Sequence, residues 1–427
     1  MARQPDCMNL SLFDSELDNK APNKCEVYHF HIYIEENIEW PFAANNAHIK
    51  GVFMHEYIHY IQHLTTLWGI SVSRHHNMLF CYYRQFFADS DTIPVPLTKS
   101  MVAPNMEPFF ECFNRIKGDR EYGERIDQIR VAEEEIHAAH DENRAVRVDT
   151  YNAETNEWLS KGLKFGYYII IESMADMVQR IYEPEVKHNE VPYLVVQKLC
   201  QNIYPEVAQD YKKMIALCTC ALMSSNPGFE FFNVVEFAKA NPEMDGVTLY
   251  KEYINSSSIT LKSKERITIA KWFEHQFEEY DKTLEQALGV ADYYHEAFES
   301  ALKCAKTGDN LFLILLYDKN VSPDNYYKCL ADYYGSPFIE AYNQTLYPGR
   351  EQMPQDVGAA IGMELLFKAI SNKSNRDCPR LDQCTRQGLD SYDCLIGNQW
   401  NREEMCLFKA AMHYFRLEDK IIEPNAV

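Results

Sequence analysis

The residues with the clearest capacity for chemistry form a five-residue motif, His55-Glu56-Tyr57-Ile58-His59, in the pattern His-Glu-x-x-His. Histidines four residues apart on a helix lie about 40° apart around its axis, one turn above each other, so two imidazole nitrogens can reach one ion. Glu56 is rotated about 100° from His55, so its carboxylate can reach a water molecule on that ion without binding the ion itself. The motif therefore predicts a Zn²⁺ site with Glu56 as a general base.

A catalytic zinc site needs a third protein ligand and an open fourth position. Glu172 is the strongest candidate, because it is a lone carboxylate after three isoleucines and is costly to bury unless it is paired or bound to a metal. Asp176 follows one turn later on the same face, where it could accept the remaining N–H of a ligating histidine. A buried carboxylate paired with Arg180 is the alternative explanation. His63 lies about 80° around the helix from His55 and two turns further along, so we expect an ordinary histidine there.

These residues fall in elements that the hydrophobic pattern predicts. The motif lies in a predicted helix over residues 47–68, which follows a period-two strand pattern over residues 26–36. Glu172 lies in a second apolar helix, predicted over residues 163–182, whereas the charged segment 120–144 predicts a solvated helix. Helices dominate thereafter, including a long stretch over residues 262–306. We expect a mainly α protein of α+β class with a small β-sheet.

The HEYIH motif followed downstream by a helical ESMAD segment resembles the gluzincin branch of the zincin metallopeptidases, the thermolysin-like enzymes. In that group the second segment has the form Glu-x-x-x-Asp. The resemblance implies that His55, His59 and Glu172 bind zinc, that Glu56 is the general base and that Asp176 orients a ligating histidine. Gluzincins usually add a Tyr or His that stabilises the oxyanion, and four residues are eligible by type alone: His75, His76, Tyr151 and Tyr168.

The sequence also predicts a domain organisation, of which the resemblance covers the catalytic core alone. Residues 1–23 are expected to form an irregular leader, and residues 24–190 a zincin-like catalytic core with a small β-sheet. The 112 residues between His59 and Glu172 exceed the spacing of the best-known family members, which implies an insertion near residues 72–160. Residues 191–427 are expected to form a helical C-terminal lobe that closes the cleft.

Composition limits the partners and the compartment. The chain carries 42 Lys and Arg against 63 Asp and Glu, a net charge of −21, which argues against a nucleic-acid-binding surface. No run approaches 18 apolar residues, so no membrane span is expected. The N-terminus lacks the pattern of a signal peptide, and 13 cysteines, an odd number, are most simply reduced thiols. A cytoplasmic protein is predicted.

A group of cysteines near the C-terminus is a second candidate metal site. Cys378, Cys384 and Cys394, with Cys406 further on, could hold a structural zinc ion, although their spacing does not give the paired C-x₂-C units of usual sites. The alternative is a set of reduced, partly buried thiols.

The sequence as a whole predicts an intracellular zinc-dependent metallopeptidase that acts on a protein or peptide substrate. We expect access to its zinc to be limited either by the inserted region or by a regulatory protein partner. Two other classes stay open. One is a catalytically silent helical interaction protein that retains a zincin-like core. The other is a protease effector of a bacterial toxin or defence system that acts only after a trigger.

Overall fold

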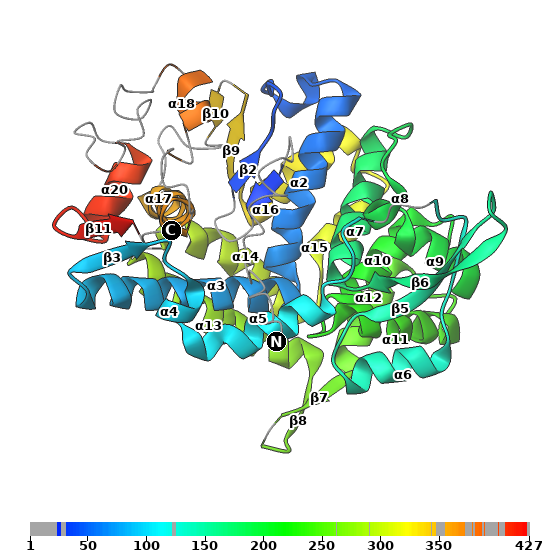
Figure 1. Cartoon of the computed structure of the whole chain (residues 1–427). Coiled ribbons are helices and arrows are strands. Elements are labelled where there is room, and N and C mark those ends of the chain that lie inside the picture. The colour runs from blue at the N-terminus through cyan, green and yellow to red at the C-terminus, as the bar shows by residue number, and fades with distance from the viewer. Residues whose placement is uncertain are drawn as a thin grey trace.

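The computed structural model describes residues 24–26, 31–121, 125–261, 263–289, 291–342, 344–346, 355–371, 378, 381–386, 388, 400 and 406–424. Within this part of the chain the structure is mainly helical, with four small β-sheets, as expected (Figure 1). The predicted leader, residues 1–23, lies outside the described residues.

Two buried helices stand side by side in the middle of the molecule (Figure 1). Helix α2, Ala47–Thr65, begins at Asn46, whose side-chain oxygen accepts a hydrogen bond from the backbone N–H of Ile49 at 2.9 Å. This is a typical N-cap. Every residue of α2 from position 53 to its end is buried, so the helix is covered on all sides. Its partner α7, Tyr167–Tyr182, is also largely buried.

A sharp corner joins α2 to helix α3, Leu67–Asp89. Thr66 caps α3 by accepting a hydrogen bond from Gly69 N–H at 3.1 Å. A Cβ atom on Gly69 would lie 2.5 Å from the Cα atom of His63, so only glycine allows the two helices to approach this closely. Gly69 therefore belongs to the first turn of α3 and does not end the preceding helix.

The largest sheet joins the beginning of the chain to a distant segment. Its strands are β1 (Lys24–Glu26), β2 (His31–Tyr33), β9 (Phe338–Ala341) and β10 (Gln344–Leu346), in that spatial order. Strands β1 and β2 are antiparallel, whereas β2 runs parallel to β9. The predicted single strand over residues 26–36 is therefore wrong. Glu26 ends β1, residues 31–33 form the antiparallel strand β2, and residues 27–30 lie outside the described residues.

A second sheet interrupts the region predicted as a charged helix. Strands β4 (Gln128–Arg130), β5 (Val146–Asn152) and β6 (Glu157–Phe165) are antiparallel, and helix α6 (Glu133–Asp141) packs against β5. The predicted helix over residues 120–144 is wrong except for α6. Residues 163–165 also belong to β6, so α7 begins four residues later than predicted.

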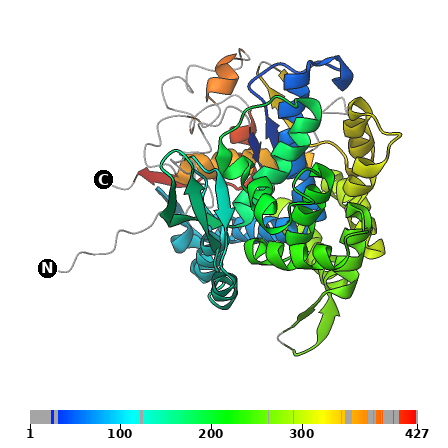
Figure 2. The ribbon, with the colours of Figure 1, turned by 90° about the vertical axis from the view of Figure 1, so that its right-hand side faces the viewer.

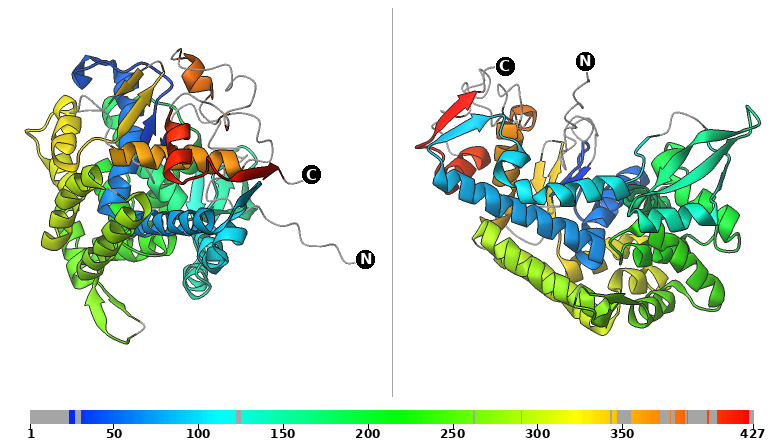
Figure 3. Two further views of the ribbon diagram at one scale, coloured as in Figure 1. Left: turned by 90° about the vertical axis from the view of Figure 1, so that its left-hand side faces the viewer. Right: turned by 60° about the horizontal axis from the view of Figure 1, so that its bottom comes forward.

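The remaining helices make up the rest of the helical body. They are α4 (Lys99–Val102), α5 (Glu107–Ile116), α8 (Glu190–Tyr193), α9 (Val195–Ile203), α10 (Tyr211–Ala221), α11 (Pro227–Ala240), α12 (Gly246–Ser256), α13 (Ile269–Leu288), α14 (Asp292–Thr307), α15 (Leu311–Tyr317), α16 (Pro323–Tyr334), α17 (Gln355–Ser371), α18 (Leu381–Arg386) and α20 (Leu407–Tyr414). Two short 3₁₀ turns, Phe42–Ala44 and Pro104–Met106, complete the helical elements named here. Helices α3 and α13 lie along each other, as Figure 3 shows.

Two small two-stranded sheets complete the described elements. Strand β3, Thr92–Val95, pairs in parallel with β11, Ile421–Pro424. Strands β7, Ser258–Thr260, and β8, Arg266–Thr268, form a hairpin that projects from the body of the molecule (Figure 2 and Figure 3). The long helical stretch predicted over residues 262–306 is therefore part of this hairpin followed by the two helices α13 and α14.

The buried residues form one contiguous core that runs from Ile32 to Leu417. In this core α7 packs on α10, and Thr219 on α10 approaches the sulfur of Met174 on α7 at 3.9 Å. The division near residue 190 stays a prediction, as does the zincin type of fold. None of the helices in the part of the chain that the structure describes combines the length and apolar character needed to cross a lipid bilayer.

Candidate metal centre

Helices α2 and α7 bring three predicted ligands together. Nε2 of His55 lies 3.3 Å from Oε2 of Glu172, and Nε2 of His59 lies 3.7 Å from Oε1 of the same carboxylate. The two imidazole rings are 5.1 Å apart and nearly perpendicular. All three residues are buried, with 8–9% of their surface exposed. The two histidines of α2 and the carboxylate of Glu172 on α7 thus come together, as predicted.

The ligand atoms of the three residues lie close enough together to hold one metal ion. Two ligand atoms at about 2.0–2.1 Å from such an ion stand about 3.3–3.4 Å from each other. The two nitrogen–oxygen distances in the structure are 3.3 and 3.7 Å, and the three ligand atoms lie within 4.8 Å of one another. Within the described residues, this triad is the group of His, Cys, Asp and Glu side chains close enough to hold a metal ion. Two imidazoles and one carboxylate form a ligand set that suits zinc.

Burial and neighbouring charges shift the pKa values of the three triad residues. Burial alone would raise the pKa of Glu172, but the charges of His59 and His55 outweigh it and lower this pKa below its usual range. Burial lowers the pKa of His59, which favours the neutral ring that a metal ion requires. Burial also opposes the charged form of His55, yet its contacts with Glu172 and the nearby charge of Glu56 raise its pKa overall. Glu172 is therefore ionised at neutral pH and the site favours a cation.

Glu56 is buried beside the triad, with 7% of its surface exposed. Its charge contributes to raising the pKa of His55 on its own helix and that of Tyr193 on α8. The carboxylate is thus within electrostatic reach of His55 and Tyr193. A general base requires such a position.

Gln62 orients His59, a role that the motif alone did not reveal. Nδ1 of His59 lies 2.9 Å from Oε1 of Gln62, and Nε2 of Gln62 donates to the backbone oxygen of Ile171 at 2.9 Å. This contact assigns the proton of His59 to Nδ1 and leaves Nε2 free to bind an ion. Gln62 is completely buried. Its position three residues after His59, on the same helix face, is the sequence feature from which this contact could have been predicted.

Asp176, which was expected to accept a hydrogen bond from a ligating histidine, is paired with Arg180 in the structure. Both oxygens of Asp176 accept hydrogen bonds from the guanidinium of Arg180, at 2.7 and 3.1 Å. Nδ1 of His55 is buried without a hydrogen-bond partner, and Nδ1 of His59 is taken by Gln62. A bidentate arginine one helical turn away satisfies the carboxylate better than a single imidazole N–H. The pairing with Arg180, the alternative explanation from the sequence, is therefore what the structure contains at Asp176.

Two histidines that follow the motif, His63 and His75, are not part of the ligand set. Nδ1 of His63 contacts the hydroxyl of Ser73 at 3.1 Å, and burial lowers the pKa of His63 to about 3. His63 is not one of the ligands, as expected, but it is buried and does not lie on the surface. His75 stacks on Phe109 at 3.4 Å, and burial lowers its pKa to about 4.

Two residues that the sequence did not single out stand beside His55. The ring of Tyr193 lies 5.8 Å from that of His55, and the ring of His188 lies 6.1 Å from it. The two rings contact each other at 4.5 Å. Burial, followed by the charges of Glu172 and Glu56, raises the pKa of Tyr193, so its phenol stays protonated and can donate a hydrogen bond. Neither residue is among the four that were eligible by type, and no spacing rule connects them to the motif.

The structure describes only some of the C-terminal cysteines that were predicted to hold a structural zinc ion. Cys378 is buried and Cys384 is partly exposed, and neither forms a disulfide bond. Cys394 lies outside the described residues. A structural zinc ion at this place stays a prediction.

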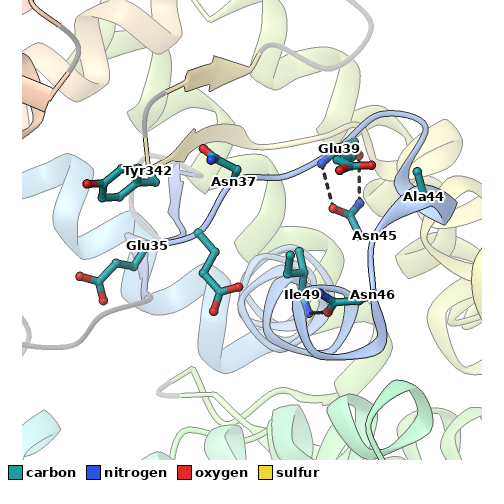
Figure 4. A pocket seen from close by; sticks show the side chains of 9 residues that line it. Glu35, Asn37, Glu39, Ala44, Asn45, Asn46, Ile49 and Tyr342 are labelled. Atoms are coloured by element: carbon teal, nitrogen blue, oxygen red, sulfur yellow. Dashed lines mark hydrogen bonds between the residues drawn. The ribbon is translucent and has the colours of Figure 1, made fainter.

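An open hollow of about 670 Å³ lies at the beginning of α2, away from the triad (Figure 4). Three glutamates, Glu35, Glu36 and Glu39, line it together with Tyr342, and Asn45 closes one side through paired hydrogen bonds with the backbone of Glu39. None of the triad residues lines this hollow. The hollow is therefore separate from the buried group on α2 and α7.

Comparisons of this chain with protein-family models, with curated proteins and with solved structures found no match. The buried group of His55, His59 and Glu172, which could hold a metal ion, is therefore the feature on which a functional assignment depends.

Proposed function

We propose that this protein is a zinc-dependent peptidase in which His55, His59 and Glu172 hold the ion. The observation that supports the proposal most strongly is the convergence of two imidazole nitrogens and one ionised carboxylate from two buried helices. The nitrogen–oxygen distance of 3.3 Å between His55 and Glu172 equals the separation of two ligands around a tetrahedral zinc ion, and the 3.7 Å between His59 and Glu172 is slightly longer. A bound zinc ion would supply Lewis acidity, which acidifies a water molecule and polarises a peptide carbonyl.

Glu56 supplies the proton transfers in this proposal. It follows a ligand directly in the sequence and is buried next to it, so its carboxylate can take a proton from an attacking water molecule and pass it to the leaving amine. Proton transfer by a positioned side chain is worth about 10²–10⁴-fold in rate.

Tyr193 supplies a hydrogen bond to the substrate oxygen. Its phenol is kept protonated by burial and by the carboxylates around it, and its ring stands beside His55. A donor aimed at the charge that develops on the carbonyl oxygen stabilises the transition state by about 2.7–4 kcal/mol. His188, which contacts Tyr193, forms the same wall of the site and is held by Gln179 at 3.1 Å.

The test compares wild type with Glu56→Gln and with Glu364→Gln, a control that alters another buried glutamate on α17. Zinc content is measured first, and each protein is then incubated with unfolded casein and a degenerate peptide mixture. New termini are counted by mass spectrometry. We expect about one zinc ion per chain in all three proteins, cleavage by wild type and the control, and a loss of about 10²–10⁴-fold in Glu56→Gln.

Two results would overturn the proposal. Equal cleavage by wild type and Glu56→Gln would remove Glu56 from the reaction. A wild-type protein that binds zinc and leaves every peptide intact would favour the silent interaction protein instead.

A further inference from the structure

His188 lies on the segment that connects α7 to α8, residues 183–189, which has neither helix nor strand. Its ring reaches back to the metal group and lies 6.1 Å from the ring of His55. Tyr193, at the end of α8, packs on His188 with the ring centres 4.5 Å apart. A contact between two rings limits the positions that either ring can take. The contacts that hold His188 therefore also limit where Tyr193 lies.

Gln179 on α7 is the hydrogen-bond partner of His188. Its Oε1 lies 3.1 Å from Nε2 of His188, and the residue is buried, with 2% of its surface exposed. Gln179 follows Glu172 by two helical turns, so both side chains lie on the same face of α7. The helix that supplies the carboxylate of the metal group therefore also supplies the partner of His188.

Glu183 fixes the orientation of the Gln179 amide. Nε2 of Gln179 donates a hydrogen bond to Oε2 of Glu183 at 3.2 Å. A carboxylate only accepts hydrogen bonds, so the amide cannot turn its oxygen towards Glu183 without losing this bond. Oε1 of Gln179 therefore faces His188 as an acceptor, and the proton of His188 lies on Nε2. The ring of His188 is held in one orientation by this bond.

His48 on α2 holds Glu183 from the other side. Nδ1 of His48 lies 3.0 Å from Oε1 of Glu183, and its Nε2 lies 3.1 Å from Oε1 of Glu36. Burial would lower the pKa of His48, but its contacts with these two carboxylates outweigh burial and raise the pKa. This favours a ring that carries a proton on both nitrogens and donates to both carboxylates. The two oxygens of Glu183 thus accept from two residues, Gln179 and His48.

The backbone of α2 packs against the same two side chains. A Cβ atom on Gly51 would lie 3.1 Å from Oε2 of Glu183 and 3.2 Å from Cγ of Gln179. Gly51 precedes His55 by one helical turn, so this packing occurs on the face of α2 that carries a ligand. The side chains of Gln179 and Glu183 are therefore confined between α2 and the segment that carries His188.

We infer that Gln179 is a positioning residue, which holds Tyr193 beside the metal group by fixing the ring of His188. The inference rests on the proposed function, in which the phenol of Tyr193 donates to the substrate oxygen. Gln179 acts through the segment between α7 and α8 and takes no part in the reaction itself. A displacement of about 1 Å in a group that contacts the substrate can cost about 10²-fold in rate, so the loss of Gln179 should lower kcat.

Three variants test the inference. Gln179→Met keeps the length of the side chain and removes both hydrogen bonds. Gln179→Glu keeps an acceptor for His188 but places a second carboxylate against Glu183. The exchange variant combines Gln179→Glu with Glu183→Gln, so the amide and the carboxylate trade places and the contacts to His188 and His48 can form again. Gln276→Met is the control, because it alters another buried glutamine, on α13.

Zinc content, kcat and KM of each zinc-loaded protein are measured with one peptide that wild type cleaves. We expect Gln179→Met and Gln179→Glu to keep zinc and KM and to lower kcat by about 10–100-fold. The exchange variant and the control should have kcat within about twofold of wild type. In a Tyr193→Phe background, Gln179→Met should lower kcat no further, because both changes remove the same interaction.

Two kinetic results would overturn the inference. One is a wild-type kcat in Gln179→Met, and the other is a loss of kcat that is just as large in the Tyr193→Phe background. If Gln179→Met does not fold, the comparison of Gln179→Glu with the exchange variant decides instead. An exchange variant as slow as Gln179→Glu would then count against the role of Gln179.

A crystal structure of Gln179→Met separates this inference from the proposed function. We expect the rings of His188 and Tyr193 to leave their positions beside His55 while the three ligands stay in place. Displaced rings, together with a wild-type protein that cleaves no peptide, would support the role of Gln179 and remove the peptidase proposal. Unmoved rings, together with peptide cleavage by wild type, would support the peptidase proposal and overturn the role of Gln179.

Discussion

Replacing Gln62 by methionine tests whether this residue holds His59 ready for an ion. In the structure the Nδ1–H of His59 donates to Gln62 at 2.9 Å in a completely buried position. Without an ion, the variant can move the His59 proton to Nε2, which lies 3.7 Å from Glu172. With zinc on Nε2 the proton is forced onto Nδ1, where methionine offers it no oxygen.

The cost of that change falls on the zinc-bound state alone. A buried donor without an acceptor costs about 1–3 kcal/mol. This corresponds to a zinc affinity reduced by about 10–100-fold, the usual effect of removing the partner of a ligating histidine. The backbone oxygen of Ile171 loses its donor in both states, so that loss lowers the stability of the fold without changing affinity.

Competition with a chromophoric chelator at fixed pH measures the zinc dissociation constant of each protein. Gln276→Met is the matched control, because Gln276 is another buried glutamine, on α13, that accepts a hydrogen bond from Arg74 at 2.7 Å. We expect the affinity of the control to stay within about twofold of wild type. A folded Gln62→Met protein with wild-type zinc affinity would refute the reasoning, as would an equal loss in the control.

Three further predictions concern activity, acid stability and the corner between α2 and α3. Tyr193→Phe should retain zinc and lower kcat by about 10²–10³-fold in the casein assay. An unchanged kcat would show that the Tyr193 phenol does not stabilise the transition state. Because burial lowers the pKa of His63 to about 3, the unfolded chain takes up this proton at a higher pH than the folded one. Stability from the neutral ring is therefore complete above pH 6.5 and falls towards pH 3 by up to ~1.4 kcal/mol per unit. The His63→Gln variant should show a flatter dependence of the unfolding free energy on pH, measured by denaturant titrations at several pH values. The same pH dependence in the variant and in wild type would contradict this prediction. Gly69→Ala should destabilise the fold by about 1–3 kcal/mol in the same titrations, because its Cβ meets backbone at 2.5 Å; an unchanged midpoint would contradict the close packing.

The metal group could be predicted because its chemistry is local. Two histidines one turn apart must share a helix face, and a lone glutamate in an apolar helix must find a partner. Both rules involve the residues themselves and need no knowledge of the fold. The structure brings His55, His59 and Glu172 to one point for those reasons.

The partners of the triad could not be predicted, because they depend on contacts between distant segments. Tyr193 reaches His55 only because α8 is tied to α7, where the Ser173 hydroxyl donates to the backbone oxygen of Pro192 at 2.8 Å. From the sequence, Asp176 could pair either with Arg180 or with a ligating histidine. The structure shows the pairing with Arg180, which depends on the geometry of the helix face.

Non-local pairing also explains the errors in secondary structure. The segment 120–144 has the charged composition of a helix, yet Gln128 and Arg130 lie in a strand because they pair with Tyr151 and Asp149 of β5. The end of β6 has apolar residues that suit either a strand or the beginning of α7. Pairing of Phe165 with Val146 decides for the strand.

The most direct test of the central claim is a crystal structure of the zinc-loaded protein with anomalous scattering recorded at the zinc edge. We expect one strong peak between α2 and α7, at about 2.0–2.2 Å from Nε2 of His55, Nε2 of His59 and a carboxylate oxygen of Glu172. A peak at another place, or a loaded protein with no zinc at these three residues, would contradict it.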